Sequence, residues 1–122
     1  MLSDVSMGWV STGCPNVEVL DLGNCITLTD WGLRALNRMP QLRVLRLDGI
    51  ENITMQGMRM LMVGEEGSPA TTGPSLYEID VSCCLNLQPD PFLRLLAEKA
   101  ISLTTLSIQN IKNIEIDWKP LQ

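Results

Sequence analysis

The sequence predicts an α/β fold, a short solenoid with a parallel β-sheet on its concave side and helices on its convex side. Three features predict it. One hydrophobic pattern recurs four times, each copy opens with the alternation of a strand that has one buried face, and each continues with the spacing of a helical stripe. No single strand–loop–helix unit can bury its apolar edge alone, so we expect stacked units with one continuous core.

The strand part of each unit fits L-x-x-L-x-L with aliphatic substitutions. Its first residues lie 25, 34 and 27 residues apart, at Val17, Leu42, Leu76 and Leu103. Apolar residues then fill two further slots in a loop, first Cys25, Ile50, Cys84 and Ile111, and then Leu28, Ile53, Leu87 and Ile114. The helical slots follow at Leu33, Met58 and Phe92 and at Leu36, Leu61 and Leu95.

The pattern divides the chain into units of one domain, residues 1–122. Residues 1–13 form a half repeat, because Leu2 fills the second loop slot and Met7 and Val10 fill the two helical slots, with no strand before them. Four repeats follow at about 14–39, 40–73, 74–100 and 101–122. Residues 64–73, rich in Gly, Pro, Ser and Thr, are expected to be a mobile surface loop, and a tolerated insertion is favoured over a binding loop.

The two ends of the array are expected to differ. Pro120 argues against a long final helix, so Trp118 and Pro120 are expected to fold over the fourth strand. The first complete strand would be an uncovered edge, and natural proteins normally cover such edges. We therefore expect the chain to be part of a longer protein or of a complex that covers its N-terminal end.

The first repeat carries a more specific signature. Residues 14–25 read C-P-N-V-E-V-L-D-L-G-N-C, and residues 26–33 read I-T-L-T-D-W-G-L. This segment resembles the cysteine-containing leucine-rich repeats of F-box/leucine-rich repeat proteins, C-P-x-L-x-x-L-x-L-x-x-C-x-x-[IL]-T-D-x-x-L. The second repeat departs from the pattern, with Ile50 in the cysteine slot and Met55 and Gln56 where Asp is expected. The resemblance implies the fold more strongly than the function, because such repeats carry many unrelated binding roles.

Composition excludes several classes of function. The chain has no histidine, the residue on which proton transfer near pH 7 and metal ligation most often rely, so we predict no enzyme, no metal site and no cofactor. A net charge of −5 argues against a nucleic-acid binder, and the apolar runs are too short to span a membrane.

The four cysteines give a clue to the compartment. Cys25 and Cys84 occupy the same slot two repeats apart, which places them about 10 Å from each other, too far for a disulfide. We expect four thiols, with Cys25 and Cys84 as small buried hydrophobes. A reducing intracellular compartment, the cytoplasm or the nucleus, is therefore predicted.

The predicted partner-binding residues lie on the concave face. In an L-x-x-L-x-L strand, the alternate residues face away from the core. These are Val19, Asp21, Val44, Arg46, Asp48, Glu78, Asp80, Thr105, Ser107 and Gln109, with Gly23 and Ser82 completing the rows. Four of them are acidic and one is basic, so Asp21, Arg46 and Asp80 would form a charge-alternating row. This face is either an ordinary solvated surface or a site for a basic protein partner.

A second surface is predicted on the helical side. Trp9 and Trp31 lie on helices, and Met60 and Met62 fall outside the core slots that Met58 and Leu61 fill, so both should be partly exposed. Such an apolar stretch is a weaker candidate for an interface.

Two functions fit these observations. The resemblance to F-box/leucine-rich repeat proteins implies a protein–protein interaction module, the substrate-recognition array of a ubiquitin ligase. The F-box, which docks such a receptor on its ligase, has no counterpart in these 122 residues, so this function requires a longer parent chain. The alternative is a structural or adaptor subunit of a large organellar, respiratory or ciliary assembly.

Overall fold

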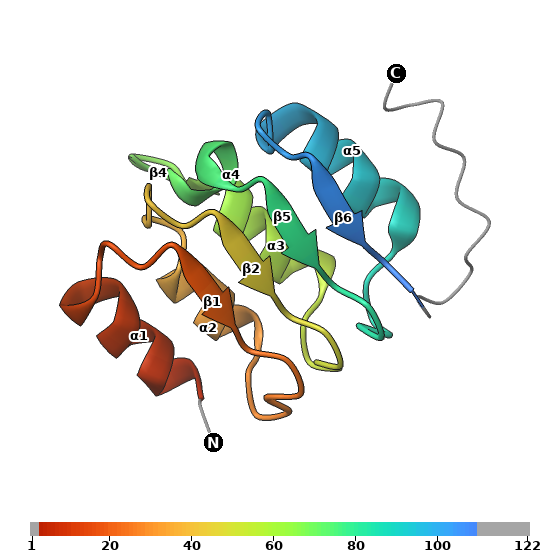
Figure 1. Ribbon diagram of the computed structural model, residues 1–122, viewed down its shortest axis with the longest axis horizontal. Helices are drawn as coiled ribbons and strands as arrows, with labels where there is room; N and C mark the ends of the chain where they lie inside the picture. Colours follow the sequence, from red (N-terminus) through yellow and green to blue (C-terminus); the bar gives the residue numbers. More distant parts are fainter. Residues whose placement is uncertain (1–2, 110–122) are drawn as a thin grey trace.

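The computed structural model describes residues 3–109, and in this range helices and strands alternate along the chain (Figure 1). The helices are α1 (Asp4–Gly13), α2 (Asp30–Ala35), α3 (Met55–Met62), α4 (Thr72–Ser75) and α5 (Pro89–Lys99). The strands are β1 (Val19–Asp21), β2 (Val44–Arg46), β3 (Gly64–Glu65), β4 (Ser68–Pro69), β5 (Glu78–Asp80) and β6 (Thr105–Ser107). The fold is mixed α/β, as the sequence predicts.

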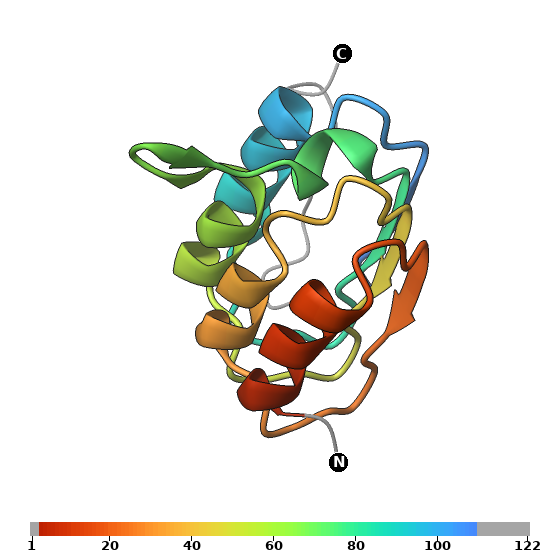
Figure 2. The same cartoon turned by 90° about the vertical axis from the view of Figure 1, so that its left-hand side faces the viewer.

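Four of the strands form one parallel sheet in the order β1-β2-β5-β6. The register aligns equivalent positions of the sequence pattern, because Leu20 pairs with Leu45, Leu45 with Ile79 and Ile79 with Leu106. Helices α1, α2, α3 and α5 lie side by side on one side of this sheet (Figure 2). The other side, which we call the open face, carries no helix within the described range.

The core lies between the sheet and the helices. Leu45 and Ile79 on the two central strands are fully buried, as are Leu33, Met58 and Leu61 on the helices. The equivalent residues of the outer strands, Leu20 and Leu106, are only partly buried. Each central strand is covered by a neighbour on both sides, whereas β1 and β6 each have one neighbour in the described part of the sheet.

The turns after β1, β2 and β5 repeat one backbone conformation. Asn24, Gly49 and Cys83 occupy the same position of the pattern and have φ values of 61°, 75° and 61°. This left-handed region suits Gly and is tolerated by Asn. The loop slot that follows holds Cys84, which is buried as expected and whose Sγ donates a hydrogen bond to the Leu47 carbonyl at 3.0 Å. Cys25, in the equivalent slot, is only half-buried.

The N-termini of adjacent helices are joined by carboxylates. Asp4, the first residue of α1, accepts hydrogen bonds from the backbone N–H and the hydroxyl of Thr29, the N-cap of α2. Asp30 accepts the same pair from Thr54, the N-cap of α3, at 2.8 and 2.6 Å. The Thr-Asp signature therefore links each of these helices to the next, and the negative charge lies at the favourable end of a helix dipole.

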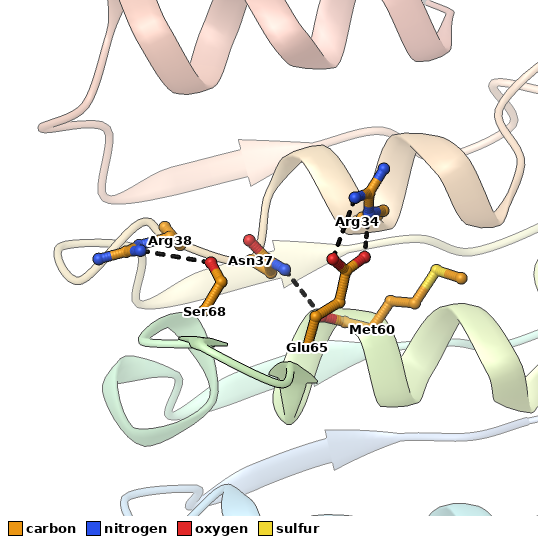
Figure 3. Close-up of polar contacts among 6 residues, drawn as sticks. All are labelled: Arg34, Asn37, Arg38, Met60, Glu65 and Ser68. Atoms are coloured by element: carbon orange, nitrogen blue, oxygen red, sulfur yellow. Dashed lines mark hydrogen bonds and ion pairs between the residues drawn. The ribbon is translucent and has the colours of Figure 1, made fainter.

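The insertion at 64–73 is not the mobile loop that its composition predicts. Strands β3 and β4 pair as an antiparallel hairpin, and α4 follows directly. Glu65 and Ser68 of the hairpin bind Arg34 of α2 and Arg38 of the turn that follows α2 (Figure 3). The prediction failed because it used local composition alone, whereas the partners of the hairpin lie about thirty residues earlier in the chain.

The first turn of α4 is also held inside the molecule. Thr72 is fully buried, and its hydroxyl donates to the Leu36 carbonyl at 2.6 Å and accepts from the Met39 N–H at 2.9 Å. The neighbouring Gly73 lies against Met62. Met62 is therefore buried, contrary to the prediction of partial exposure, whereas Met60 is half-buried as expected.

Several sequence-based expectations fall outside the described residues. These concern the half-repeat residue Leu2, the loop residues Ile111 and Ile114, and the closure of the last strand by Trp118 and Pro120.

Candidate functional site

The open face of the sheet brings the predicted partner-binding residues together in rows. Strand pairing places Val19, Val44, Glu78 and Thr105 side by side in one row and Asp21, Arg46, Asp80 and Ser107 in the next. Backbone hydrogen bonds continue the ladder past the strands, from the Asn24 N–H to the Asp48 carbonyl and from the Cys83 N–H to the Gln109 carbonyl. The third row is therefore Gly23, Asp48, Ser82 and Gln109.

Strand pairing places Asp21, Arg46 and Asp80 in the predicted charge-alternating row, but Arg46 forms its ion pair outside this row. The Arg46 guanidinium forms its ion pair with Glu78 of the first row, at 2.9 Å between Nη2 and Oε2. It forms none with Asp21 or Asp80, its direct neighbours in the described sheet. A strand row fixes only the Cα positions, and the long arginine side chain reaches the diagonal carboxylate.

Two of the carboxylates serve the turns. Asp21 Oδ1 accepts a hydrogen bond from the Gly23 N–H at 3.0 Å, and Asp80 Oδ1 accepts one from the Ser82 N–H at 2.9 Å. These bonds cap the ends of β1 and β5 in the manner of Asx turns. Asp21 and Asp80 therefore have a structural role, in addition to the negative charge that they place on the open face.

Asp48 differs from the other carboxylates of the face. Its carboxylate is partly exposed and forms no hydrogen bond or ion pair within residues 3–109. Its row neighbour Gly23 has no side chain to cover it. Val19, whose exposed fraction is 55%, places an apolar surface two rows away on β1. The open face thus combines a free carboxylate with exposed aliphatic surface.

A fourth row, which the prediction left out, extends this face. Glu18, Arg43, Tyr77 and Thr104 stand in register just before the four strands, as successive N–H to carbonyl hydrogen bonds show. The Arg43 guanidinium lies 4.6 Å from the centre of the Tyr77 ring and 3.8 Å from Glu18 Oε1. The signal was present in the sequence, since these residues share the second position of L-x-x-L-x-L, the first of its variable positions.

The described part of the chain offers little for catalysis or metal binding. No cluster of three or more Cys, Asp or Glu side chains suited to a metal ion occurs in residues 3–109. All four cysteines are thiols. Burial raises the pKa of the Cys84 thiol to about 11, so it is protonated and a poor nucleophile at neutral pH.

Comparison with known proteins places the chain in no group. No protein-family profile matches the chain, and no curated protein matches it. Among the helices between residues 3 and 109, none has the length and apolar character needed to cross a bilayer.

Proposed function

We propose that this chain is a leucine-rich repeat solenoid of the cysteine-containing subtype that binds a protein partner on its open, concave face. The in-register repetition of strand, left-handed turn and helix N-terminus supports the repeat assignment. Four thiols among the described residues support a reducing compartment, the cytoplasm or the nucleus. No catalytic activity is proposed.

The observation that carries the proposal is the composition of the open face. Of the four carboxylates in the first three rows, Glu78 is neutralised by Arg46, while Asp21, Asp48 and Asp80 face no ion-pair partner within residues 3–109. Val19 and Val44 add aliphatic surface beside them. A partner that presents Lys or Arg next to an apolar side chain complements this surface in charge and in shape.

The biological role that fits best is substrate recognition for an F-box-type ubiquitin ligase. This part of the proposal rests on the resemblance of residues 14–33 to the repeats of F-box/leucine-rich repeat proteins. In such a receptor the open face would select the substrate, and a ligase-docking segment would belong to a longer parent chain.

A structural or adaptor subunit of a large assembly is the second candidate. The exposed aromatic side chains on the helical side favour it, because Trp9 and Trp31 are 70% and 63% exposed on α1 and α2. An adaptor uses two faces of the molecule, whereas a receptor needs only the open face for its substrate.

Affinity purification with matched variants tests the proposal. Asp48→Lys reverses a charge on the open face without removing a hydrogen bond, and Glu98→Lys makes the same change on the exposed surface of α5. Quantitative mass spectrometry should show partners that fall about tenfold with Asp48→Lys and are retained with Glu98→Lys.

The identity of those partners separates the two roles. A ligase scaffold among the retained proteins supports the receptor, and several subunits of one assembly support the adaptor. Equal recovery with both variants would contradict binding on the open face.

A further inference from the structure

The helical side of the molecule carries large apolar side chains that are exposed. Trp9 and Val5 on α1 and Trp31 on α2 have exposed fractions of 70%, 63% and 63%. Large apolar side chains that gather on a surface commonly mark an interaction site, and Trp is among the residues that contribute most to binding energy.

Next to Trp31, the hairpin builds one wall of a groove. The groove has a volume of about 440 Å³ and lies between α1, α2 and the β3–β4 hairpin. It is lined by Ser11 and Thr12 from α1, Trp31 and Arg34 from α2, Arg38 from the turn after α2, and Glu65 from β3, among others. Figure 3 shows how Arg34 of α2 and Arg38 of the following turn reach the two strands of the hairpin.

The charges in the groove are unevenly compensated. Arg34 binds Glu65 through two hydrogen bonds, with 3.1 Å between Nη2 and Oε2, and this contact lowers the pKa of the Glu65 carboxyl. The Arg34 guanidinium also lies 5.6 Å from the centre of the Trp31 ring. Arg38 only donates to the neutral Ser68 hydroxyl at 3.4 Å and forms no ion pair in the described part of the chain. One arginine, Arg38, therefore keeps an uncompensated positive charge in a groove that the exposed Trp31 also lines.

We propose that this groove binds a peptide segment of a partner protein that carries a carboxylate next to an aromatic or aliphatic side chain. The carboxylate pairs with Arg38, whose fork of donors matches it in geometry, and the apolar side chain packs on Trp31. A nucleic acid fits less well, because it brings one phosphate per nucleotide to a groove that also contains Glu65, on a chain with net charge −5.

The site is independent of the proposed basic partner of the open face. It lies on the opposite side of the sheet, and it selects the opposite charge. Loss of one binding activity would leave the other intact.

The test is a titration of the ¹⁵N-labelled full chain followed by NMR. The probe is the acetylated and amidated peptide Glu-Glu-Phe-Leu-Glu, and the signal followed is the indole N–H of Trp31, assigned with a Trp31→Phe variant. We expect a saturable shift of this signal. The same peptide with glutamine in place of each glutamate should produce a much smaller shift at equal concentration.

Variants then assign the contacts. Arg38→Gln should raise the dissociation constant about five-fold, as expected for a partly exposed ion pair. Trp31→Ala, followed through the backbone N–H of residue 38, should raise it about tenfold or more. Arg94→Gln, which removes an exposed arginine from α5, should leave it unchanged. Because Trp31 and Arg38 are exposed, the spectra of all variants should remain those of the folded chain.

Three results would overturn the proposal. The first is the absence of a saturable shift of the Trp31 signal at millimolar peptide. The second is a glutamine peptide that binds as tightly as the acidic peptide, or an Arg38→Gln variant that binds the acidic peptide as tightly as the unchanged protein does. The third is a single-stranded oligonucleotide of five nucleotides that shifts Trp31 at lower concentration than the acidic peptide does.

Discussion

The helix layer is assembled in two different ways along the chain. Between α1 and α2, and again between α2 and α3, an aspartate at the start of one helix binds the N-cap threonine of the next. Between α3 and α5 this link is missing, because the aspartate position holds the buried Met55 and the threonine position holds Gln88, followed by Pro89. The first two junctions are polar and repeated, whereas the third is apolar.

Glycine makes the polar junction possible. A Cβ built on Gly57 would overlap the carboxylate of Asp30, and one built on Gly32 would overlap that of Asp4. At the third junction the equivalent position is Pro91, which has a side chain, and no carboxylate faces it from Met55. The glycine and the carboxylate of a polar junction thus depend on each other. Both are therefore absent together from the third junction, which has Pro91 and Met55 in their places.

The third unit is held by other contacts. Cys84 Sγ donates to the Leu47 carbonyl. The Asn86 side chain donates to the Glu51 carbonyl at 2.7 Å, a contact that this unit shares with the preceding one, where Asn52 donates to the Ile26 carbonyl. The insertion adds α4, whose Gly73 lies between Met62 of α3 and the Lys99 carbonyl at the end of α5. Burial and backbone contacts replace the carboxylate link here.

The largest effect is expected from removing a junction carboxylate. Asp30→Ala leaves the Thr54 N–H and hydroxyl without their acceptors in a half-buried site, so the free energy of unfolding should fall by about 2–4 kcal/mol. Asp90→Ala, at the second position of the unlinked helix α5, should cost no more than about 0.5 kcal/mol. Urea denaturation measures both. Equal losses in the two variants would show that the junctions do not differ in energy.

A glycine substitution should give the next largest effect. Gly57→Ala forces its Cβ onto the Asp30 carboxylate, which two hydrogen bonds hold in place, and should destabilise the protein by about 1–3 kcal/mol. Gly8→Ala is the matched control, because its Cβ would meet nothing within 4 Å on α1. The better helix propensity of Ala should make this control more stable by about 0.5–1 kcal/mol. If Gly8→Ala also lowered the free energy of unfolding, the loss in Gly57→Ala could not be assigned to the contact with Asp30.

The thiol link of the third unit should respond to pH. Burial raises the pKa of Cys84 from its ordinary value near 9.0 to about 11, so the unfolded chain loses this proton first as the pH rises. The contribution of the protonated thiol to the free energy of unfolding is fully present below pH 9. It declines between pH 9 and 11, and the total loss is on the order of 2 kcal/mol. The Cys84→Ala variant should lack this decline. Denaturant unfolding of both proteins at pH 8, 9, 10 and 11 measures the difference, and parallel curves would contradict it.

The repeated pattern predicted much of the fold. The outward and inward positions of the strands depend only on a period of two, and the sheet aligns them as the sequence repeat does. The candidate site was predicted as a set of positions for the same reason. Which charges pair there could not be predicted, because the reach and rotamer of Arg46 select Glu78 over Asp21 and Asp80.

The sequence by itself determined the units, their facing and the residues of the core, because these follow from local periodicity. Only the tertiary structure decided what lies next to the insertion, which carboxylates serve the turns and which residues form the groove beside Trp31. These features join residues from different repeats, such as Arg34 with Glu65 and Asp30 with Thr54. Their partners are chosen by three-dimensional packing, which a one-dimensional pattern does not contain.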